Sequence, residues 1–328
     1  RQILENMVRS GVLLNLISSG ARIHQAGCNG CIGMGQAPAS GRNSLRTVPR
    51  NFPSRSGTKE DAVYLVSPET ATASALTGKI TDPRRMEELF GMSYPRFEEP
   101  EEYLVNTELL VPPPTNGERA ELIKGPNISS LPEFGELTDF EGPVLLKMGD
   151  NVSTDEILKA GAEVLPFRSN IEEISKFSFS VIDEQFYERV MKAKPEYESH
   201  MVVAGENYAQ GSSREHAAIA PRYLGQRAVL AKSYARIGWQ NLVNFGIVPL
   251  QFDREEDYDK IEQGDIIRTA GLRDQLESGR TVTIINVTQG LEIPAHHEMS
   301  ARQIETVLHG GIINSYKRRI AASAERNS

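Results

Sequence analysis

The sequence predicts an α/β protein built from two domains and an extended linker. Strand and helix patterns alternate in both halves of the chain, which is typical of α/β layers. Seven of the eighteen prolines lie between Pro95 and Pro132, among many acidic residues, which favours an extended connector. The length of 328 residues allows two ordinary domains. We therefore expect a first domain over 1–98, a linker over 99–142 and a second domain over 143–328.

The first domain begins with a helix pattern over residues 1–18, where apolar side chains recur near helical spacing. No N-cap and no methionine precede this helix, so we expect that the chain begins inside a domain. A short buried strand is predicted at 63–66 (VYLV). Ser67 then caps a helix with Pro68 at its first position, and Gly78 follows the end of that helix.

The second domain repeats the alternation of strands and helices. Strands are predicted at 144–148, 201–204, 228–231, 247–252 and 282–287. Helices are predicted at 213–224, at 235–245 and from Ser300 onward. Gly246 ends the second helix, Gln303 completes a capping box with Ser300, and Gly310-Gly311 ends the last helix.

Composition and charge exclude several function classes. The chain is 39% hydrophobic and 24% charged, as in globular proteins, and no apolar run reaches membrane-spanning length. The net charge of -8 argues against a nucleic-acid surface. It does not argue against small anionic substrates, because a few local arginines decide their binding. No secretory signal opens the chain, and we expect a cytoplasmic protein without membrane contact.

Only two cysteines occur, Cys28 and Cys31, which excludes a disulfide framework. They lie in AGCNGCIGMGQAP, where glycines would let the backbone approach a metal centre shared by two thiolates. An iron–sulfur site is one interpretation. A thioredoxin-like redox pair and half of a structural zinc site are the alternatives that the spacing leaves open.

Candidate anion-binding residues fall in three further segments. Arg50 and Arg55 (RNFPSR) could clamp carboxylates, although a solvated surface pair is the simpler reading. In GENYAQGSSR, Ser212 and its neighbours follow a glycine-rich loop ahead of a predicted helix, which suits an anion. A plain N-cap is the alternative there. Arg168 follows a glycine loop and has little diagnostic value alone.

These segments together resemble the aconitase superfamily, which includes aconitate hydratase, homoaconitase and 3-isopropylmalate dehydratase. The matching blocks occur in family order over residues 20–252. They are GARIHQAGCNGCIGMGQAP, RNFPSRSGT, YLVSPETATASALTGKI, GDNVSTDEI, LPFRSNI, GENYAQGSSREHAAIAPRYLG and KSYARIGWQNLVNFGIVPLQF. The SSREH and ARI stretches resemble aconitate hydratase more than 3-isopropylmalate dehydratase, and GGIIN resembles bacterial members.

The resemblance implies a role for each candidate residue. Cys28 and Cys31 match two of three thiolate ligands of a 4Fe–4S cluster, and the third family cysteine lies upstream. Ser212 matches the catalytic base. The implied substrate binders are Arg50, Arg55, Arg168, Ser213 and Arg214. The sequence departs from the family pattern at Asn29-Gly30, Pro49, Ser54 and Glu156.

The implied fold is a partial three-layer α/β cluster-bearing domain joined to a swivel domain. The implied activity is that of an iron–sulfur hydro-lyase converting citrate to isocitrate through cis-aconitate, in which a base removes a proton and iron polarises the leaving hydroxide. Homoaconitase and 3-isopropylmalate dehydratase are alternatives, and RNA binding without the cluster is a minor one. We expect that the missing N-terminal part of the same protein is the partner, and that these residues alone hold no stable cluster and are inactive.

Overall fold

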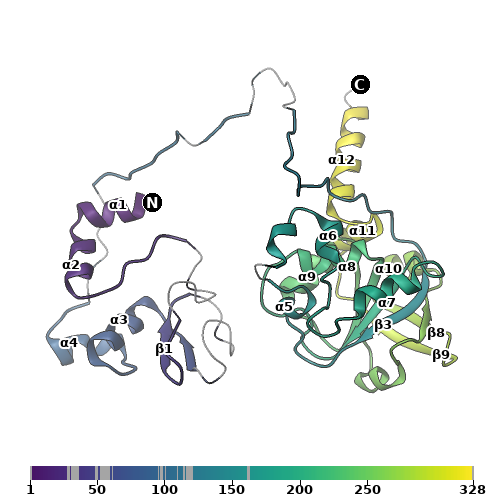
Figure 1. The fold of residues 1–328 in the computed structure, drawn as a ribbon, viewed down its shortest axis with the longest axis horizontal. Helices are drawn as coiled ribbons and strands as arrows, with labels where there is room; N and C mark the ends of the chain where they lie inside the picture. Colours follow the sequence, from purple (N-terminus) through teal and green to yellow (C-terminus); the bar gives the residue numbers. More distant parts are fainter. Residues whose placement is uncertain are drawn as a thin grey trace. The chain divides into compact units, whose positions relative to one another are not determined.

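The structure, a computed structural model, describes residues 2–27, 30, 37–48, 51, 60, 62–94, 96, 99, 101–108, 110–113, 115, 121–160 and 163–326. The chain divides into two compact units, Arg1–Ala120 and Glu121–Ser328 (Figure 1). Each unit is described by itself. The predicted boundaries of the domains and the linker stay predictions.

The described part of the first unit combines helices with a two-stranded parallel sheet. Its elements are α1 (Gln2–Arg9), α2 (Val12–Ser18), β1 (Asn43–Arg46), β2 (Ala62–Leu65), α3 (Pro68–Thr77), a 3₁₀ turn (Pro83–Arg85) and α4 (Met86–Phe90). The single helix predicted over 1–18 is wrong, because Gly11 adopts a left-handed φ of 77° and separates α1 from α2.

The capping residues predicted for α3 are confirmed. The Ser67 hydroxyl accepts a hydrogen bond of 3.1 Å from the backbone N–H of Thr70, and Pro68 occupies the first turn. Gly78 ends the helix with a left-handed φ of 74°. Local capping chemistry therefore fixes both ends of this helix.

The second unit is a mixed α/β fold around a closed barrel with the strand order β3-β4-β5-β6-β9-β8-β7. The strands are β3 (Glu141–Lys147), β4 (His200–Ala204), β5 (Gln226–Ala231), β6 (Val248–Phe252), β7 (Ile266–Arg268), β8 (Thr281–Asn286) and β9 (Leu291–His296). β3, β4, β5 and β6 run parallel to their neighbours in that order, and the remaining pairs are antiparallel. The five predicted strands are confirmed, whereas β7 and β9 were not predicted.

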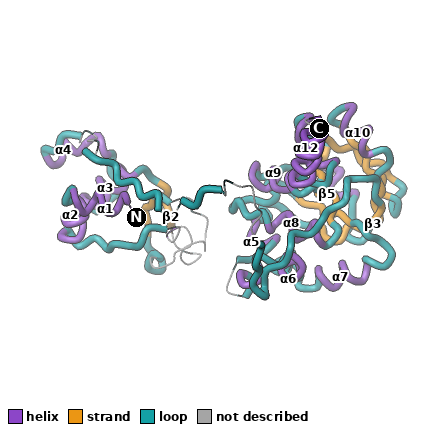
Figure 2. The backbone as a smooth tube through the Cα atoms, turned by 90° about the horizontal axis from the view of Figure 1, so that it is seen from above, coloured by secondary structure: helices purple, strands orange, loops and turns teal. Residues whose placement is uncertain are grey.

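Helices follow most of the strands, and Figure 2 shows them on the outside of the orange strands. They are α5 (Thr154–Ile157), α6 (Ile171–Ser175), α7 (Phe186–Ala193), α8 (His216–Tyr223), α9 (Arg236–Asn244), α10 (Leu272–Ser278), α11 (Ala301–Leu308) and α12 (Ile312–Arg326). The capping box of Ser300 and Gln303 is confirmed at the start of α11. The start predicted for α8 is wrong by three residues, because the helix begins at His216 and not at residue 213.

Both faces of the parallel strands are buried. Met201 and Val203 of β4 belong to one apolar cluster, while Val202 and Ala204 belong to another. Successive strand residues point to opposite faces, so β4 is covered on both sides. β4 is therefore buried along its length, and the loop of residues 205–215 follows its carboxyl end.

Candidate functional site

Three loops meet where the parallel strands β3, β4 and β5 end, and we call this place the carboxyl edge. The loops span residues 148–153, 205–215 and 232–235. The Asn151 N–H donates to the Glu206 carbonyl at 2.7 Å, and the Tyr208 N–H donates to the Ser233 carbonyl at 3.0 Å. The middle loop is therefore hydrogen-bonded to both neighbours, and such edges of parallel sheets commonly bind ligands.

The middle loop is held in an unusual backbone conformation. Asn207 and Ala209 have positive φ angles of 56° and 62°, which cost side-chain-bearing residues free energy. The Asn207 N–H donates to the Ser233 hydroxyl at 2.8 Å, and the Gln210 side chain donates to the Asn151 carbonyl at 2.8 Å. Backbone strain that neighbouring groups over-determine is typical of ligand sites.

Ser212 lies at the carboxyl edge, and its hydroxyl has no hydrogen-bond partner among the described residues. Its backbone N–H donates to the Thr154 hydroxyl at 3.0 Å, whereas neither its own hydroxyl nor that of Ser213 hydrogen-bonds to any described residue. Neither serine caps α8, because the N-cap is Glu215, whose side chain makes no capping bond. The N-cap alternative is therefore wrong, and both hydroxyls are available to a ligand.

Arg214 lies against α5. Its guanidinium donates to Asp155 at 2.8 Å and to the backbone carbonyl of Leu158, and its side chain is only 17% exposed. The charge of Arg214 is thus balanced by a carboxylate 59 residues earlier in the chain. Sequence reasoning missed Asp155, although it lies in the GDNVSTDEI block.

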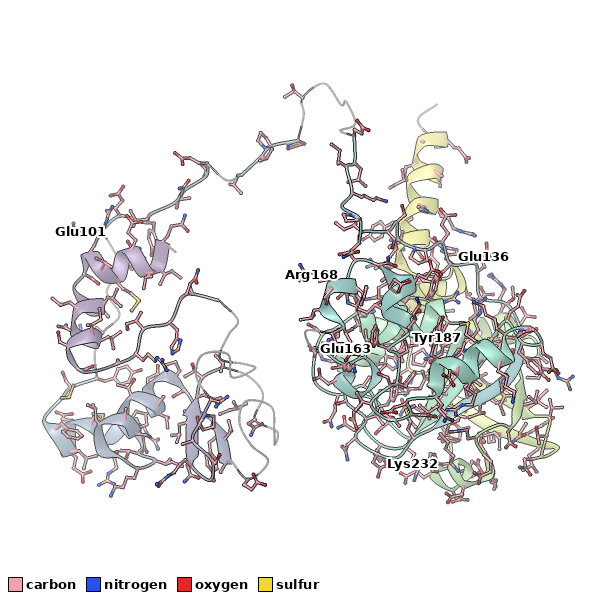
Figure 3. The ribbon with its side chains drawn as sticks, in the orientation of Figure 1. Glu101, Glu136, Glu163, Arg168, Tyr187 and Lys232 are labelled. Carbon is pink, nitrogen blue, oxygen red and sulfur yellow. The ribbon has the colours of Figure 1, made fainter. Side chains whose placement is uncertain are left out.

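Arg168 lies beside the start of α8. The His216 Nε2 donates to the Arg168 carbonyl at 2.7 Å, because a carbonyl can only accept. The Arg168 guanidinium makes no hydrogen bond or ion pair with the described residues, and Figure 3 shows Arg168 on the outside of the second unit. The structure therefore joins the Arg168 backbone to the first residue of α8, His216, which sequence reasoning did not single out.

Glu156, a departure from the family pattern, has a structural role here. It accepts a hydrogen bond of 2.7 Å from the Ser153 backbone N–H, and its own N–H donates to the Ser153 hydroxyl at 3.2 Å. This reciprocal capping box starts α5. The glutamate thus orders the helix that also carries Asp155.

The other predicted site residues, Cys28, Cys31, Arg50 and Arg55, lie outside the described residues. Their roles stay predictions. Within the described ranges, no group of three or more histidine, cysteine, aspartate or glutamate side chains could hold a metal ion. None of the helices in these ranges has the length and apolar character of a membrane span.

Two family models match the chain. Residues 1–78 match the aconitase family (aconitate hydratase), and residues 150–255 match the aconitase C-terminal domain. A solved structure of 3-isopropylmalate dehydratase from Methanocaldococcus jannaschii aligns with a TM-score of 0.47 and 29% identity, covering 58% of this chain and 99% of that chain.

Curated relatives align over nearly the whole chain. They include the mitochondrial "Probable aconitate hydratase" of Dictyostelium discoideum (32% identical, 96% of this chain) and the mitochondrial aconitate hydratase of Gracilaria gracilis (30%, 96%). The mitochondrial homocitrate dehydratase of Saccharomyces cerevisiae is 30% identical over 95% of this chain. The chain spans about half the length of these relatives, 46% in each case. With both models and these relatives matching in order, the chain belongs to the aconitase superfamily.

Proposed function

We propose that this chain is part of a hydro-lyase acting on small polycarboxylic acids, with interconversion of citrate and isocitrate through cis-aconitate as its reaction. One observation supports this most directly. The Ser212 and Ser213 hydroxyls, which make no hydrogen bond to a described residue, lie at the carboxyl edge of a parallel sheet, and Arg214 follows them directly in the chain. A base, a hydroxyl donor and a cation are the groups that proton removal beside a carboxylate requires.

In this proposal Ser212 removes the proton from the carbon next to a substrate carboxylate. Ser213 and Arg168 bind carboxylate oxygens, and Arg50 and Arg55 add two further clamps. The ion pair with Asp155 fixes the position of the Arg214 side chain, and Arg214 orients one substrate carboxylate from that position. The swivel role of residues 143–328 and the cluster-bearing role of residues 1–98 belong to the same proposal.

The iron–sulfur cluster that the family implies does not fit on this chain alone. A three-thiolate site needs three cysteines, and the chain has only Cys28 and Cys31. We propose that the third thiolate comes from the N-terminal part of the whole protein, and that these 328 residues alone turn over no substrate. Iron analysis and visible absorbance of the chain after anaerobic reconstitution test this, and a stable 4Fe–4S spectrum would contradict it.

A substrate panel on the full-length, anaerobically reconstituted protein tests the function. We expect the highest kcat/KM on citrate and isocitrate. Homocitrate dehydratase activity is the second candidate, because the yeast relative with that name is 30% identical. A preference for homocitrate or for 3-isopropylmalate would move the assignment to that acid, and inactivity on all three would refute the proposal.

Two minor predictions accompany this function. The net charge of -8 leads us to expect no tight RNA binding in a gel shift at physiological salt. The predicted cytoplasmic location stays a prediction, since the three relatives above are named as mitochondrial proteins. Fractionation of cells expressing the full-length protein distinguishes the two compartments.

A further inference from the structure

A pocket lies in the second unit near the amino end of β5, at the opposite end of that strand from the carboxyl edge. Its volume is about 500 Å³, and Arg222, Arg227 and Lys194 line it together with Glu198 and residues 132–135. Arg227 is the second residue of β5, so the pocket adjoins the amino end of that strand. The loops that carry Ser212 follow the carboxyl ends, and no residue of those loops lines this pocket. We call it the arginine pocket.

Arg222 brings a buried charge to the arginine pocket. It is only 3% exposed, and its guanidinium donates to the carbonyls of Phe245 and Gly135, each at 3.2 Å. It also lies over the Phe134 ring, 5.0 Å from the centroid. Among the described residues no carboxylate forms an ion pair with it. A buried guanidinium with carbonyl partners alone lacks the anion that usually balances such a charge.

Arg227 adds an unsatisfied donor to the same pocket. Its Nε donates to the Ser199 hydroxyl at 3.2 Å, but its Nη1 is buried and has no hydrogen-bond partner among the described residues. Glu198 is exposed and forms no ion pair with Arg227. A buried donor without a hydrogen-bond partner costs more free energy when it is charged than when it is neutral. An acceptor bound to the Arg227 guanidinium would therefore stabilise the folded protein.

We propose that the arginine pocket binds a small oxyanion, a phosphate or a carboxylate, through Arg222 and Arg227. The planar guanidinium matches two oxygens of either group. Burial is the main cause of the pKa shifts around the arginine pocket, and the Arg227 charge adds to it for Arg222 and His200. Burial and then the Arg227 charge lower the pKa of Arg222 to about 9, and the same two causes lower the pKa of His200 to about 3. Burial also lowers the pKa of Arg227, although Glu198 opposes this.

Titration of the 328-residue chain with inorganic phosphate tests the proposal, with acetate as the carboxylate arm and ionic strength held constant with sodium chloride. Binding should be saturable and should shift the side-chain Nε–Hε resonances of Arg222 and Arg227. Arg227→Gln should weaken it by about tenfold or more, since one charge-assisted contact is lost. Tighter binding of phosphate or of acetate identifies the oxyanion class.

Arg280→Gln is the matched control, because it removes the same charge from an exposed side chain that only approaches Glu298 at 3.5 Å. Equal weakening by both variants would show general charge screening and overturn the proposal. Absence of saturable binding to the unsubstituted chain would do the same, as would saturation that leaves the Arg222 and Arg227 resonances unmoved. The last readout needs no variant, so a folding defect in Arg227→Gln cannot hide the answer.

Discussion

Asp155 balances the positive charge next to Ser212, because its carboxylate pairs with Arg214, the one cation of the segment Ser212 to Arg214. The Asp155–Arg214 distance is 2.8 Å, and the two side chains are 35% and 17% exposed. An alkoxide at Ser212 needs cations that are not already balanced. The Arg168 guanidinium has no partner among the described residues, whereas that of Arg214 is already paired with Asp155.

Substitution of Asp155 by asparagine should destabilise the protein. The change leaves the partly buried Arg214 without its carboxylate, and we expect a loss of about 1–3 kcal/mol in the free energy of unfolding. Urea unfolding of the chain measures it. The exposed Asp259 forms no ion pair with the described residues, so Asp259→Asn is the control variant. It should change that free energy by less than about 0.5 kcal/mol. Equal effects of the two variants would contradict the structural role of the pair.

At the scale of single residues, the sequence identified Ser212 and Ser213 as candidates but did not predict the residues that contact their segment. The position of Ser212 and Ser213 before a helix pattern predicted an anion site, which stays a prediction, and neither serine caps α8. The pairing of Arg214 with Asp155 joins residues 59 positions apart, which periodicity and capping rules cannot see. The same is true of the contact between His216 and Arg168 across 48 positions.

At the scale of elements, α9 packs tightly against the loop that carries Ser212. A Cβ added to Gly238 would lie 2.4 Å from the Ala209 Cβ and 2.7 Å from the Ala209 carbonyl oxygen. Gly238→Ala must therefore displace that loop or α9, and we expect a loss of about 1–3 kcal/mol in the free energy of unfolding. Gly279→Ala, whose Cβ would meet nothing within 4 Å, is the control. If both variants unfold at the same urea concentration, the close approach is refuted.

His200, the first residue of β4, makes the free energy of unfolding depend on pH. Burial, with the Arg227 charge, lowers the pKa of His200 to about 3, from about 6.5 when unfolded. A lowered folded-state pKa gives stability that is complete above pH 6.5 and declines toward pH 3, because the unfolded state binds the extra proton. Between pH 6.5 and pH 5 we expect this histidine to account for a loss of about 1–2 kcal/mol.

Urea unfolding at the two pH values measures this loss, and His200→Gln supplies the reference because glutamine does not titrate. The difference between the two pH values should be smaller in the variant by the amount expected for the histidine. An identical pH dependence in both proteins would show that His200 does not titrate as its burial requires.

Element prediction succeeded where local signals were strong. The helix α3 has a serine cap, an early proline and a terminal glycine within the segment Ser67 to Gly78, and all three act as predicted. The strands β7 and β9 were missed because β7 has only three residues and β9 contains Pro294, which disfavours a strand. Closure of the barrel depends on these two strands, so it could not be inferred from local sequence.

At the scale of the whole molecule, the two units differ in how much apolar surface they bury. Apart from Ala73, every hydrophobic residue buried among the described residues lies in the second unit. Its barrel is closed and contains its own apolar clusters. The second unit therefore has what a domain needs to fold independently.

Residues 121–328 expressed alone should accordingly show a cooperative urea transition with the midpoint of the major transition of the full chain. Residues 1–120 alone should show no cooperative transition, because their described part buries too little apolar surface to offset chain entropy. Circular dichroism during urea titration measures both. An unfolded 121–328 chain would show that the barrel depends on residues before Glu121.

The central claim is that Ser212 acts as the catalytic base. Turnover by the full-length, reconstituted protein tests this claim most directly. Ser212→Ala should lower kcat for citrate–isocitrate interconversion by about 10²–10⁴-fold with little change in KM, as loss of a general base does. The exposed Ser278, replaced by alanine, should leave kcat unchanged. A Ser212→Ala enzyme that keeps the kcat of the unsubstituted protein would contradict the account.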